Sequence, residues 1–381
     1  MEQKLASDFE QIFMSGPDVN EKDILIVVDM LRNGWYGKNA YHYVEKFEKD
    51  FAEYHERKFA LMTPNCTHAI HLILTAIGVG ELDEVIVPES TWIASAVPVT
   101  YLKSNIVFAD VDEDNWCLNY ETIVEKITDK TKAIIAVDLY GNMPNYDELE
   151  RYCEDKGIYL IEDAAEALGS IYHNRRAGNF GFASVFSFHR TKTLTTGEGG
   201  ILLLDDEKIY KECKILRDHG RQPGSFYNTQ LAFKYMPSNL SAALGFAQFQ
   251  RIDELVSHKQ NILRNYKELF NSIRDLKFNQ ETNEIKNGAW STVMVLGDSI
   301  PFDSAAVLDW FEKNSIPARP FFHPLSSLPA FAKYKNKKSE LNKNSQKLFT
   351  RGLCLPSASN LSKAQQTKVY EVFKDLYDKY C

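Results

Sequence analysis

Short apolar runs alternate with longer helical segments through the middle of the chain. The apolar runs cover residues 84–88, 106–112, 133–141, 158–167, 183–188 and 200–206. Between them, helical patterns begin near residue 65 and at residue 90, and cover residues 120–127 and 146–156. Strands that alternate with helices are typical of βαβ units. The pattern therefore predicts an α/β fold, a doubly wound, mostly parallel sheet with helices on both faces.

The two ends of the chain follow a different pattern. The first 60 residues indicate helices over residues 24–34 and 44–57, separated by a loop that contains GWYG. After residue 250 the pattern predicts a long helix, a strand at residues 289–298, a second helix, and a closing helix at residues 362–380. We therefore expect a large α/β domain with an N-terminal helical segment (residues 1–250) and a small α+β domain (residues 251–381).

Composition excludes several classes of partner. With 381 residues, 44% hydrophobic and 25% charged, the chain is typical of a soluble globular protein. The formal net charge of -8 argues against nucleic acid and against an anionic membrane as partners. The first residues, MEQKLASDFEQIF, lack the pattern of a signal peptide, and the sequence contains no run of 18 apolar residues. We therefore expect a cytoplasmic protein. The six cysteines form no CxxC pair, which indicates reduced thiols and no metal site.

One lysine, Lys192, lies in a polar loop between the apolar runs at residues 183–188 and 200–206. In open α/β sheets, ligands bind at the carboxyl ends of the strands, and this loop follows such an end. Partial desolvation there favours the neutral amine, which condenses with an aldehyde or ketone. Since most lysines are exposed, a solvated loop lysine is the alternative.

Asp163 ends the preceding apolar strand, at the same edge of the predicted sheet. A buried carboxylate needs a partner, and the protonated ring nitrogen of pyridoxal phosphate is one. The alternative is that Asp163 caps a helix beginning at the sequence AAEALG.

Weaker candidates lie at other strand ends. Trp92 follows a strand and could stack on a planar ring, although tryptophans are also common in cores. Thr67 and His68 open a predicted helix, and their backbone amides together with the hydroxyls of Thr67 and Ser187 could hold a phosphate.

The order of these candidates along the chain resembles the DegT/DnrJ/EryC1/StrS sugar aminotransferases, within the fold type I group of pyridoxal phosphate enzymes. The resemblance covers nearly the whole chain and rests on NGWYG, VEKFEKDFAEY, PNCTHAIHLIL, DEVIVPESTWIASA, DLYGNM, IEDAAEALGS, GNFGFASVFSFHRTKTLTTGEGG, RDHGR, YMPSNLSAALGFAQ and ARPFFHPL. It implies pyridoxal 5'-phosphate as cofactor, an amino acid donor such as L-glutamate, a keto sugar acceptor, and a homodimer with shared active sites.

The resemblance also assigns roles to residues. It implies Lys192 as the Schiff-base lysine, Asp163 as the partner of the pyridinium nitrogen and Trp92 as the stacking aromatic. Glu166 falls near the position of the cofactor's ring oxygen. The phosphate-binding positions are Thr67, His68 and Ser187. The predicted contacts to the sugar are Trp35, Tyr36, His189, Arg319 and His323.

Three positions depart from the family pattern. Cys66 stands where glycine is common, and His68 where a small residue is common. Lys234 stands where many relatives have an asparagine that reaches the neighbouring subunit's phosphate, so we expect Lys234 to supply that contact by charge. The alternative is a solvent-facing loop lysine, since most lysines are exposed. Members that dehydrate their substrate carry histidine at the Lys192 position, so the lysine favours amino transfer.

The sequence is compatible with three functions. The first is amino transfer to a nucleotide-linked keto-deoxy sugar for the biosynthesis of a cell-surface polysaccharide such as lipopolysaccharide. The second is amino transfer to an oxo sugar acid without a nucleotide, such as an 8-oxo derivative of 3-deoxy-octulosonate. The third is a binding protein on the same fold that has lost its chemistry, against which the presence of both Asp163 and Lys192 argues.

Overall fold

A seven-stranded sheet forms the centre of the part of the chain that the computed structural model describes, residues 11–222, 224–334 and 342–381. Its strand order is β1-β9-β8-β5-β4-β2-β3, and β9 runs antiparallel to both of its neighbours while the other pairs are parallel. The strands are β1 Phe59–Thr63, β2 Glu84–Pro88, β3 Asn105–Ala109, β4 Thr131–Val137, β5 Tyr159–Asp163, β8 Ala183–Ser187 and β9 Gly200–Leu204. The predicted α/β class and mostly parallel sheet are confirmed.

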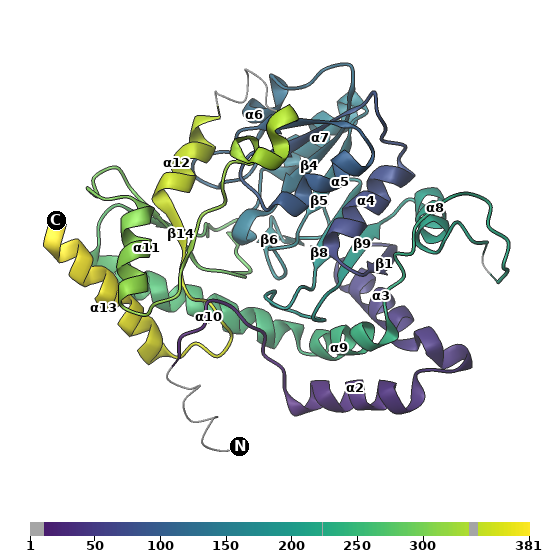
Figure 1. Cartoon of the computed structure of the whole chain (residues 1–381), viewed down its shortest axis with the longest axis horizontal. Coiled ribbons are helices and arrows are strands. Elements are labelled where there is room, and N and C mark those ends of the chain that lie inside the picture. Colours follow the sequence, from purple (N-terminus) through teal and green to yellow (C-terminus); the bar gives the residue numbers. More distant parts are fainter. Residues whose placement is uncertain (1–10, 223, 335–341) are drawn as a thin grey trace.

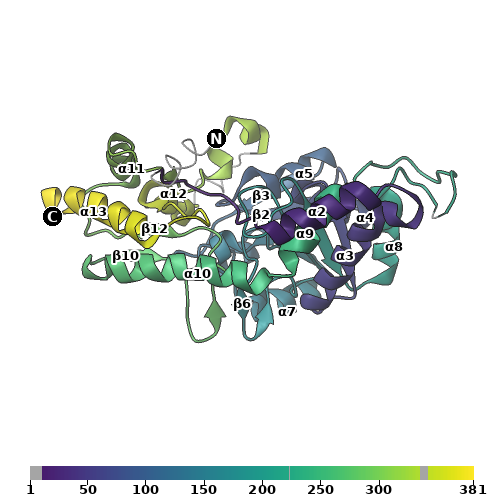
Figure 2. The same ribbon diagram turned by 90° about the horizontal axis from the view of Figure 1, so that it is seen from below.

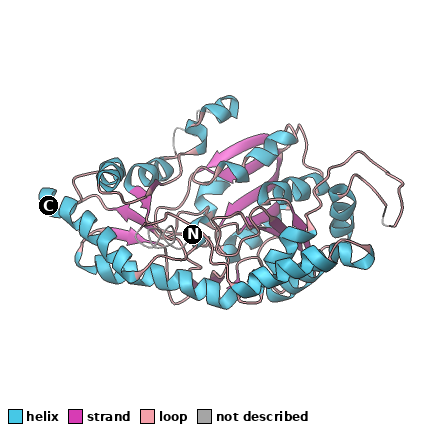
Figure 3. Cartoon of the chain, turned by 60° about the horizontal axis from the view of Figure 1, so that its bottom comes forward, coloured by secondary structure: helices cyan, strands magenta, loops and turns pink. Residues whose placement is uncertain are grey.

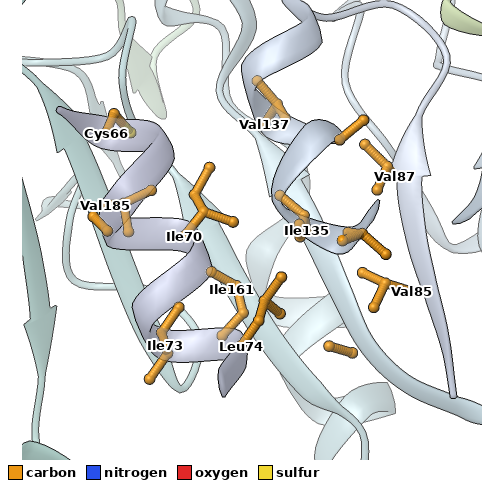
Figure 4. Packing of buried hydrophobic residues seen from close by; sticks show 14 of the residues in the cluster. Cys66, Ile70, Ile73, Leu74, Val85, Val87, Ile135, Val137, Ile161 and Val185 are labelled. Carbon is orange, nitrogen blue, oxygen red and sulfur yellow. The ribbon is translucent and has the colours of Figure 1, made fainter. Parts of the chain in front are cut away.

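Helices on both faces bury this sheet (Figure 1). The helices and 3₁₀ turns of this part of the chain are α2 Glu21–Asn33, η1 Gly37–Tyr41, α3 His42–Tyr54, α4 Cys66–Ala76, η2 Ile93–Ser95, α5 Val97–Tyr101, α6 Tyr120–Val124, η3 Leu139–Gly141, α7 Tyr146–Lys156, α8 Glu207–Arg217 and α9 Asn239–Phe249. Figure 4 shows how α4 packs, with Cys66, Ile70, Ile73 and Leu74 lying close to the valines and isoleucines of the strands. Full burial of each large aliphatic side chain stabilises the fold by about 1.5–3 kcal/mol.

A second, antiparallel sheet with the order β10-β12-β14-β13 follows later in the chain. Its strands are β10 Leu276–Phe278, β12 Val293–Leu296, β13 Arg319–Pro320 and β14 Gly352–Cys354. It is accompanied by α10 Ile252–Leu269, η4 Phe270–Ser272, α11 Ser304–Lys313, η5 Leu325–Ser327, η6 Pro329–Tyr334, α12 Lys343–Arg351 and α13 Lys363–Tyr380. These two sheets lie in separate parts of the molecule (Figure 3), and α10 runs beside the smaller one (Figure 2).

A third, three-stranded sheet with the order β11-β6-β7 pairs segments that come from before and after residue 250. β11 Ile285–Lys286 pairs with β6 Ile171–Tyr172, which in turn pairs with β7 Arg175–Arg176. Near the N-terminus, Ile12 belongs to the hydrophobic core around the four-stranded sheet, and Met14 O accepts a hydrogen bond from Ser357 N–H at 2.8 Å. The first described residues thus pack on the C-terminal part, and the domain boundary at residue 250 stays a prediction.

Two predicted helices are shorter than expected. The helix expected from Ser90 begins only at Ile93 as a 3₁₀ turn, and α5 starts separately at Val97. Pro98 has no N–H to donate and therefore begins a helix rather than continuing one. α6 ends at Val124 instead of residue 127, because the chain closes a tight turn after Ile123.

The buried Lys259 of α10 allows a prediction about stability. Its amine donates a hydrogen bond to Ser357 O, its side chain is 1% exposed, and burial lowers its pKa from 10.5 to about 8. Since the unfolded chain binds this proton more tightly, Lys259 destabilises the fold fully below pH 8, by about 3 kcal/mol, and this cost disappears above pH 10.5.

Lys259→Met should raise the free energy of unfolding at pH 7 by about 1–2 kcal/mol, because the lost hydrogen bond offsets part of the relieved cost. The gain should shrink towards pH 10. Urea unfolding at both pH values measures it, with the exposed Lys368→Met as control. A gain that is the same at both pH values would contradict this account.

Candidate active site

A cavity of about 920 Å³ opens at the carboxyl ends of the large sheet's central strands. Its walls come from the ends of β4, β5 and β8, from the start of α4, and from residues 290–291 and 319–328 of the C-terminal part. Met14 and Ser15 of the N-terminal segment also line it. The position agrees with the general rule for ligand sites in open α/β sheets.

Lys192 projects into this cavity from the loop between β8 and β9. Its Nζ lies 3.5 Å from Glu166 Oε1 and 3.6 Å from the centre of the Trp290 ring, and its side chain is 13% exposed. The indole N–H of Trp290 donates to Thr191 O at 2.7 Å and so fixes the loop. The amine is therefore held in place beside one carboxylate and one aromatic face, unlike a solvated loop lysine.

Asp163 ends β5 and is 3% exposed. Its carboxylate accepts hydrogen bonds from Ser95 Oγ at 2.7 Å and from Ala165 N–H at 3.2 Å. Burial raises the pKa of the Asp163 carboxyl, while these donors and the Lys192 charge act in the opposite direction. Residues 164–170 form turns and no helix, so Asp163 is not the cap of a helix at AAEALG.

Glu166 lies on the same side of the cavity as Lys192 and is also buried. Its Oε2 accepts the Tyr140 N–H at 3.0 Å. Burial raises the pKa of the Glu166 carboxyl, and the neighbouring Lys192 charge is the strongest opposing influence. The ion pair therefore holds the Lys192 amine beside a carboxylate in a poorly hydrated part of the cavity.

An aromatic wall lines the cavity beside these groups. The rings of Tyr140 and Phe322 are stacked with centroids 5.2 Å apart, and Tyr140 is also parallel to Trp290 at 6.1 Å. Trp92 lies 6.0 Å from Phe322 and is 59% exposed, so its ring lines the cavity and is not part of the core. Such flat apolar surfaces suit a planar ring.

The N-terminus of α4 reaches the cavity through Cys66 and Thr67. A Cβ on Gly200 would lie 2.4 Å from Cys66 N, so glycine is needed for β9 to pass this close. Among the described residues no acceptor takes up the Cys66 and Thr67 N–H groups. Ser187 lines the cavity nearby.

The structure does not bring His68 into this group. Its N–H is already bonded to the capping side chain of Asn65 at 2.9 Å, because Asn65 is the N-cap of α4. Its ring stacks on Tyr235 at 4.0 Å, and the residue does not line the cavity.

The predicted substrate residues divide into two groups. His189, Arg319 and His323 line the cavity. Burial lowers the pKa of the His189 imidazole, the Glu198 carboxylate acts in the opposite direction, and the cations of Lys192, Arg190 and Arg319 lower the pKa further. Trp35 and Tyr36 are exposed in the loop between α2 and η1, outside this cavity.

Lys234 also lies outside the chain's own cavity. Its Nζ is 2.8 Å from Asp218 Oδ1, and its side chain is half exposed. Within one chain, Lys234 therefore does not reach the N-terminus of α4.

Several residues of the site were not predicted from the sequence, among them Ser95, Tyr140, Trp290, Phe322 and Arg190. Ser95 had a local signal, because it follows Thr91 by four residues in the turn PESTWIAS. Trp290 had none, because it meets the Lys192 loop from a strand region almost a hundred residues later.

Comparison with known proteins agrees with this geometry. The model of the DegT/DnrJ/EryC1/StrS aminotransferase family matches residues 17–374. The chain is 32% identical over 362 residues to the GDP-perosamine synthase of Vibrio cholerae, covering 95% of this chain and 97% of that protein. It is also 32% identical over 365 residues to the GDP-perosamine synthase of Escherichia coli O157:H7, with 95% and 97% covered.

A solved structure extends the comparison to three dimensions. The PLP form of a protein described as a sugar aminotransferase from Streptococcus pneumoniae superposes with a TM-score of 0.89 at 27% identity, covering 97% of this chain and all of that one (100%). The chain belongs to the DegT/DnrJ/EryC1/StrS aminotransferase family. It is accordingly an aminotransferase that depends on pyridoxal 5'-phosphate.

The residues present fit this cofactor. The buried Asp163 carboxylate suits the protonated ring nitrogen, and the free N–H groups at the start of α4 suit the phosphate. The amine of Lys192 lies in the same cavity and suits the cofactor's aldehyde, with which an amine condenses. No described helix is both long and apolar enough to cross a bilayer.

Proposed function

We propose that this enzyme transfers an amino group from an amino acid donor, L-glutamate, to the carbonyl of a nucleotide-linked keto sugar. The observation that carries the proposal is the convergence of Lys192, Glu166 and Asp163 in one cavity large enough for such a substrate. The names of the two GDP-perosamine synthases support the substrate class. They favour it over the oxo derivative of 3-deoxy-octulosonate, and the buried amine argues against a binding protein without chemistry.

Each site residue has a separate task in this scheme. When bound, pyridoxal phosphate supplies the electron sink that stabilises negative charge at the donor's α-carbon. The Lys192 amine acts first as the base that takes the proton from that carbon, and then as the acid that returns a proton. Asp163 stays ionised, and its negative charge would keep the ring nitrogen of the bound cofactor protonated. The aromatic wall excludes water from the reacting atoms.

The cavity mouth contributes charge for substrate binding. Arg190 and Arg319 line it, and neither guanidinium makes a hydrogen bond or ion pair with another described residue. Two free guanidinium groups in a protein of net charge -8 suit an anionic substrate group, for which planar bidentate contacts are available.

Isotope transfer tests the proposal directly. The loaded enzyme is incubated with ¹⁵N-labelled L-glutamate and a panel of keto sugars, some linked to a nucleoside diphosphate and some free. We expect 2-oxoglutarate and a labelled amino sugar to form from the nucleotide-linked compounds, with the two-stage kinetics of a ping-pong reaction. Label appearing only in free sugar acids would overturn the substrate class, and label appearing nowhere would overturn the sugar acceptor.

We further propose that two subunits share each active site. A phosphate dianion at the start of α4 needs a cation, and Lys234 of a second subunit can supply it across a two-fold axis. Its ion pair with Asp218 holds it on an exposed surface, where a second copy can approach.

Mixing the subunits of two variants tests whether the active site is shared. Lys234→Ala homodimers should lose cofactor more readily, and Lys192→Ala homodimers should be inactive. A mixed dimer places both defects in one site and leaves the other site intact, so each mixed dimer should have up to half of the activity of a wild-type dimer, and at low cofactor concentration the mixture should be more active than either preparation alone. Light scattering that finds an active monomer, or mixtures without any recovery, would contradict the shared site.

A further inference from the structure

The Asp163 carboxylate is held by a short hydrogen-bond chain that starts at Thr91. Ser95 Oγ donates to Asp163 Oδ2 at 2.7 Å, and Thr91 Oγ1 lies 3.0 Å from Ser95 Oγ. Both hydroxyl-bearing residues are buried. Because an ionised carboxylate only accepts hydrogen bonds, Ser95 donates to Asp163 and Thr91 donates to Ser95. The charge of Asp163 therefore fixes the direction of the whole chain.

One turn of the backbone places both the hydroxyl chain and the stacking aromatic. Ser95 is the last residue of η2, and its N–H donates to Trp92 O at 3.1 Å. The turn thus directs Ser95 towards Asp163 while Trp92 lines the cavity. Pro98 at the start of α5 prevents a continuous helix, which would reorient these side chains.

The second oxygen of Asp163 has weaker donors. Asp163 Oδ1 accepts from Ala165 N–H at 3.2 Å and faces the Cys66 thiol at 3.9 Å. A thiol is a poor donor, so it does little for the carboxylate. Burial raises the pKa of Asp163, and the Ser95 hydroxyl is the strongest contact that acts against this rise. The ionised form of Asp163 therefore depends most on Ser95.

We propose that Ser95, oriented by Thr91, is a positioning residue for amino transfer: its hydroxyl keeps the Asp163 carboxylate ionised and fixes its orientation in the cavity. The role rests on the cofactor chemistry of the proposed function and is independent of the sugar. Neither residue needs to touch a substrate for this role. It acts through Asp163 alone.

The protonation of the cofactor's ring nitrogen reports this role without any substrate. Enzyme loaded with pyridoxal phosphate that carries ¹⁵N in its ring is measured by NMR at pH 7. In Ser95→Ala the Asp163 carboxyl becomes more basic, so the proton should move from the ring nitrogen towards Asp163. The ¹⁵N resonance of the ring should therefore shift towards that of a neutral pyridine. Since a hydrogen bond to a charged group is lost, the cofactor dissociation constant should rise about tenfold.

Matched variants on the same turn sharpen the test. Thr91→Val removes the hydroxyl at nearly constant shape and should give a smaller shift in the same direction, while Thr91→Ser should resemble the wild type. Ser90 is the control, because its buried hydroxyl has no hydrogen-bond partner among the described residues. Ser90→Ala should leave both the resonance and the dissociation constant unchanged.

A wild-type nitrogen resonance in Ser95→Ala would overturn the proposal. If Ser95→Ala does not fold, a wild-type resonance in Thr91→Val does the same. No amino donor or sugar enters the measurement, so such a result leaves the proposed function standing. Wild-type protein that binds no pyridoxal phosphate would instead contradict the proposed function.

Discussion

Replacing Lys192 with alanine is expected to lower the rate of amino transfer by about four orders of magnitude or more, because among the described residues that line the cavity it is the only lysine. The side chain extends from a loop into the cavity and is not part of a hydrophobic core cluster. The free energy of unfolding should therefore change little. Steady-state rates and urea unfolding, measured on the same preparations, separate the two effects.

Chemical trapping provides the control for this variant. Borohydride reduction of the loaded wild-type enzyme should fix the cofactor to the peptide that contains Lys192, as mass spectrometry detects. The Lys192→Ala variant should trap none, whereas Lys208→Ala, an exposed lysine of α8, should behave as the wild type. Trapping on another lysine, or turnover close to the wild-type rate, would exclude Lys192 as the reacting amine.

Asp163→Asn is expected to slow the half-reaction with the amino donor by about two to three orders of magnitude, because a neutral amide cannot keep the ring nitrogen protonated. An asparagine keeps the shape and can pair with both Ser95 and Ala165. Stopped-flow absorbance of the bound cofactor measures the rate. A rate within about twofold of the wild type would show that the charge of Asp163 is not used.

For Asp163→Asn we expect the stability of the fold to change in the direction opposite to the rate. The pKa of the Asp163 carboxyl is raised in the fold, so above that pKa the ionised group destabilises the protein relative to the unfolded chain. The amide has no such cost. Asp163→Asn should therefore be at least as stable as the wild type at pH 7 without cofactor, while Glu154→Gln, an exposed control on α7, should change neither quantity. A gain in stability with a loss of rate is the expected trade-off for a catalytic group.

The strand ends that form the site were predictable because their pattern is local. Asp163 and Lys192 each follow an apolar run of about five residues, and a parallel sheet brings such ends to one edge. The strands β6, β7 and β11 were not predicted, since two residues are too few to show any alternation.

Contacts between distant segments mark the limit of such prediction. The Trp290 ring above Lys192 depends on how the second sheet docks on the first, and nothing near residue 290 indicates it. The N–H of His68 was expected at the phosphate, but the choice between a ligand and the Asn65 side chain is decided by a single rotamer at the cap. Both depend on geometry that the residue order alone does not specify.

The contact between Met14 and Ser357 has a consequence for biosynthesis. Met14 lines the cavity from one end of the chain and is held there by a residue close to the other end. During translation, the large sheet can form while later residues are still in the ribosome, since its strands end at Leu204. The wall around Met14 forms only after Ser357 has emerged, so the cavity is expected to be completed well after the large sheet has formed.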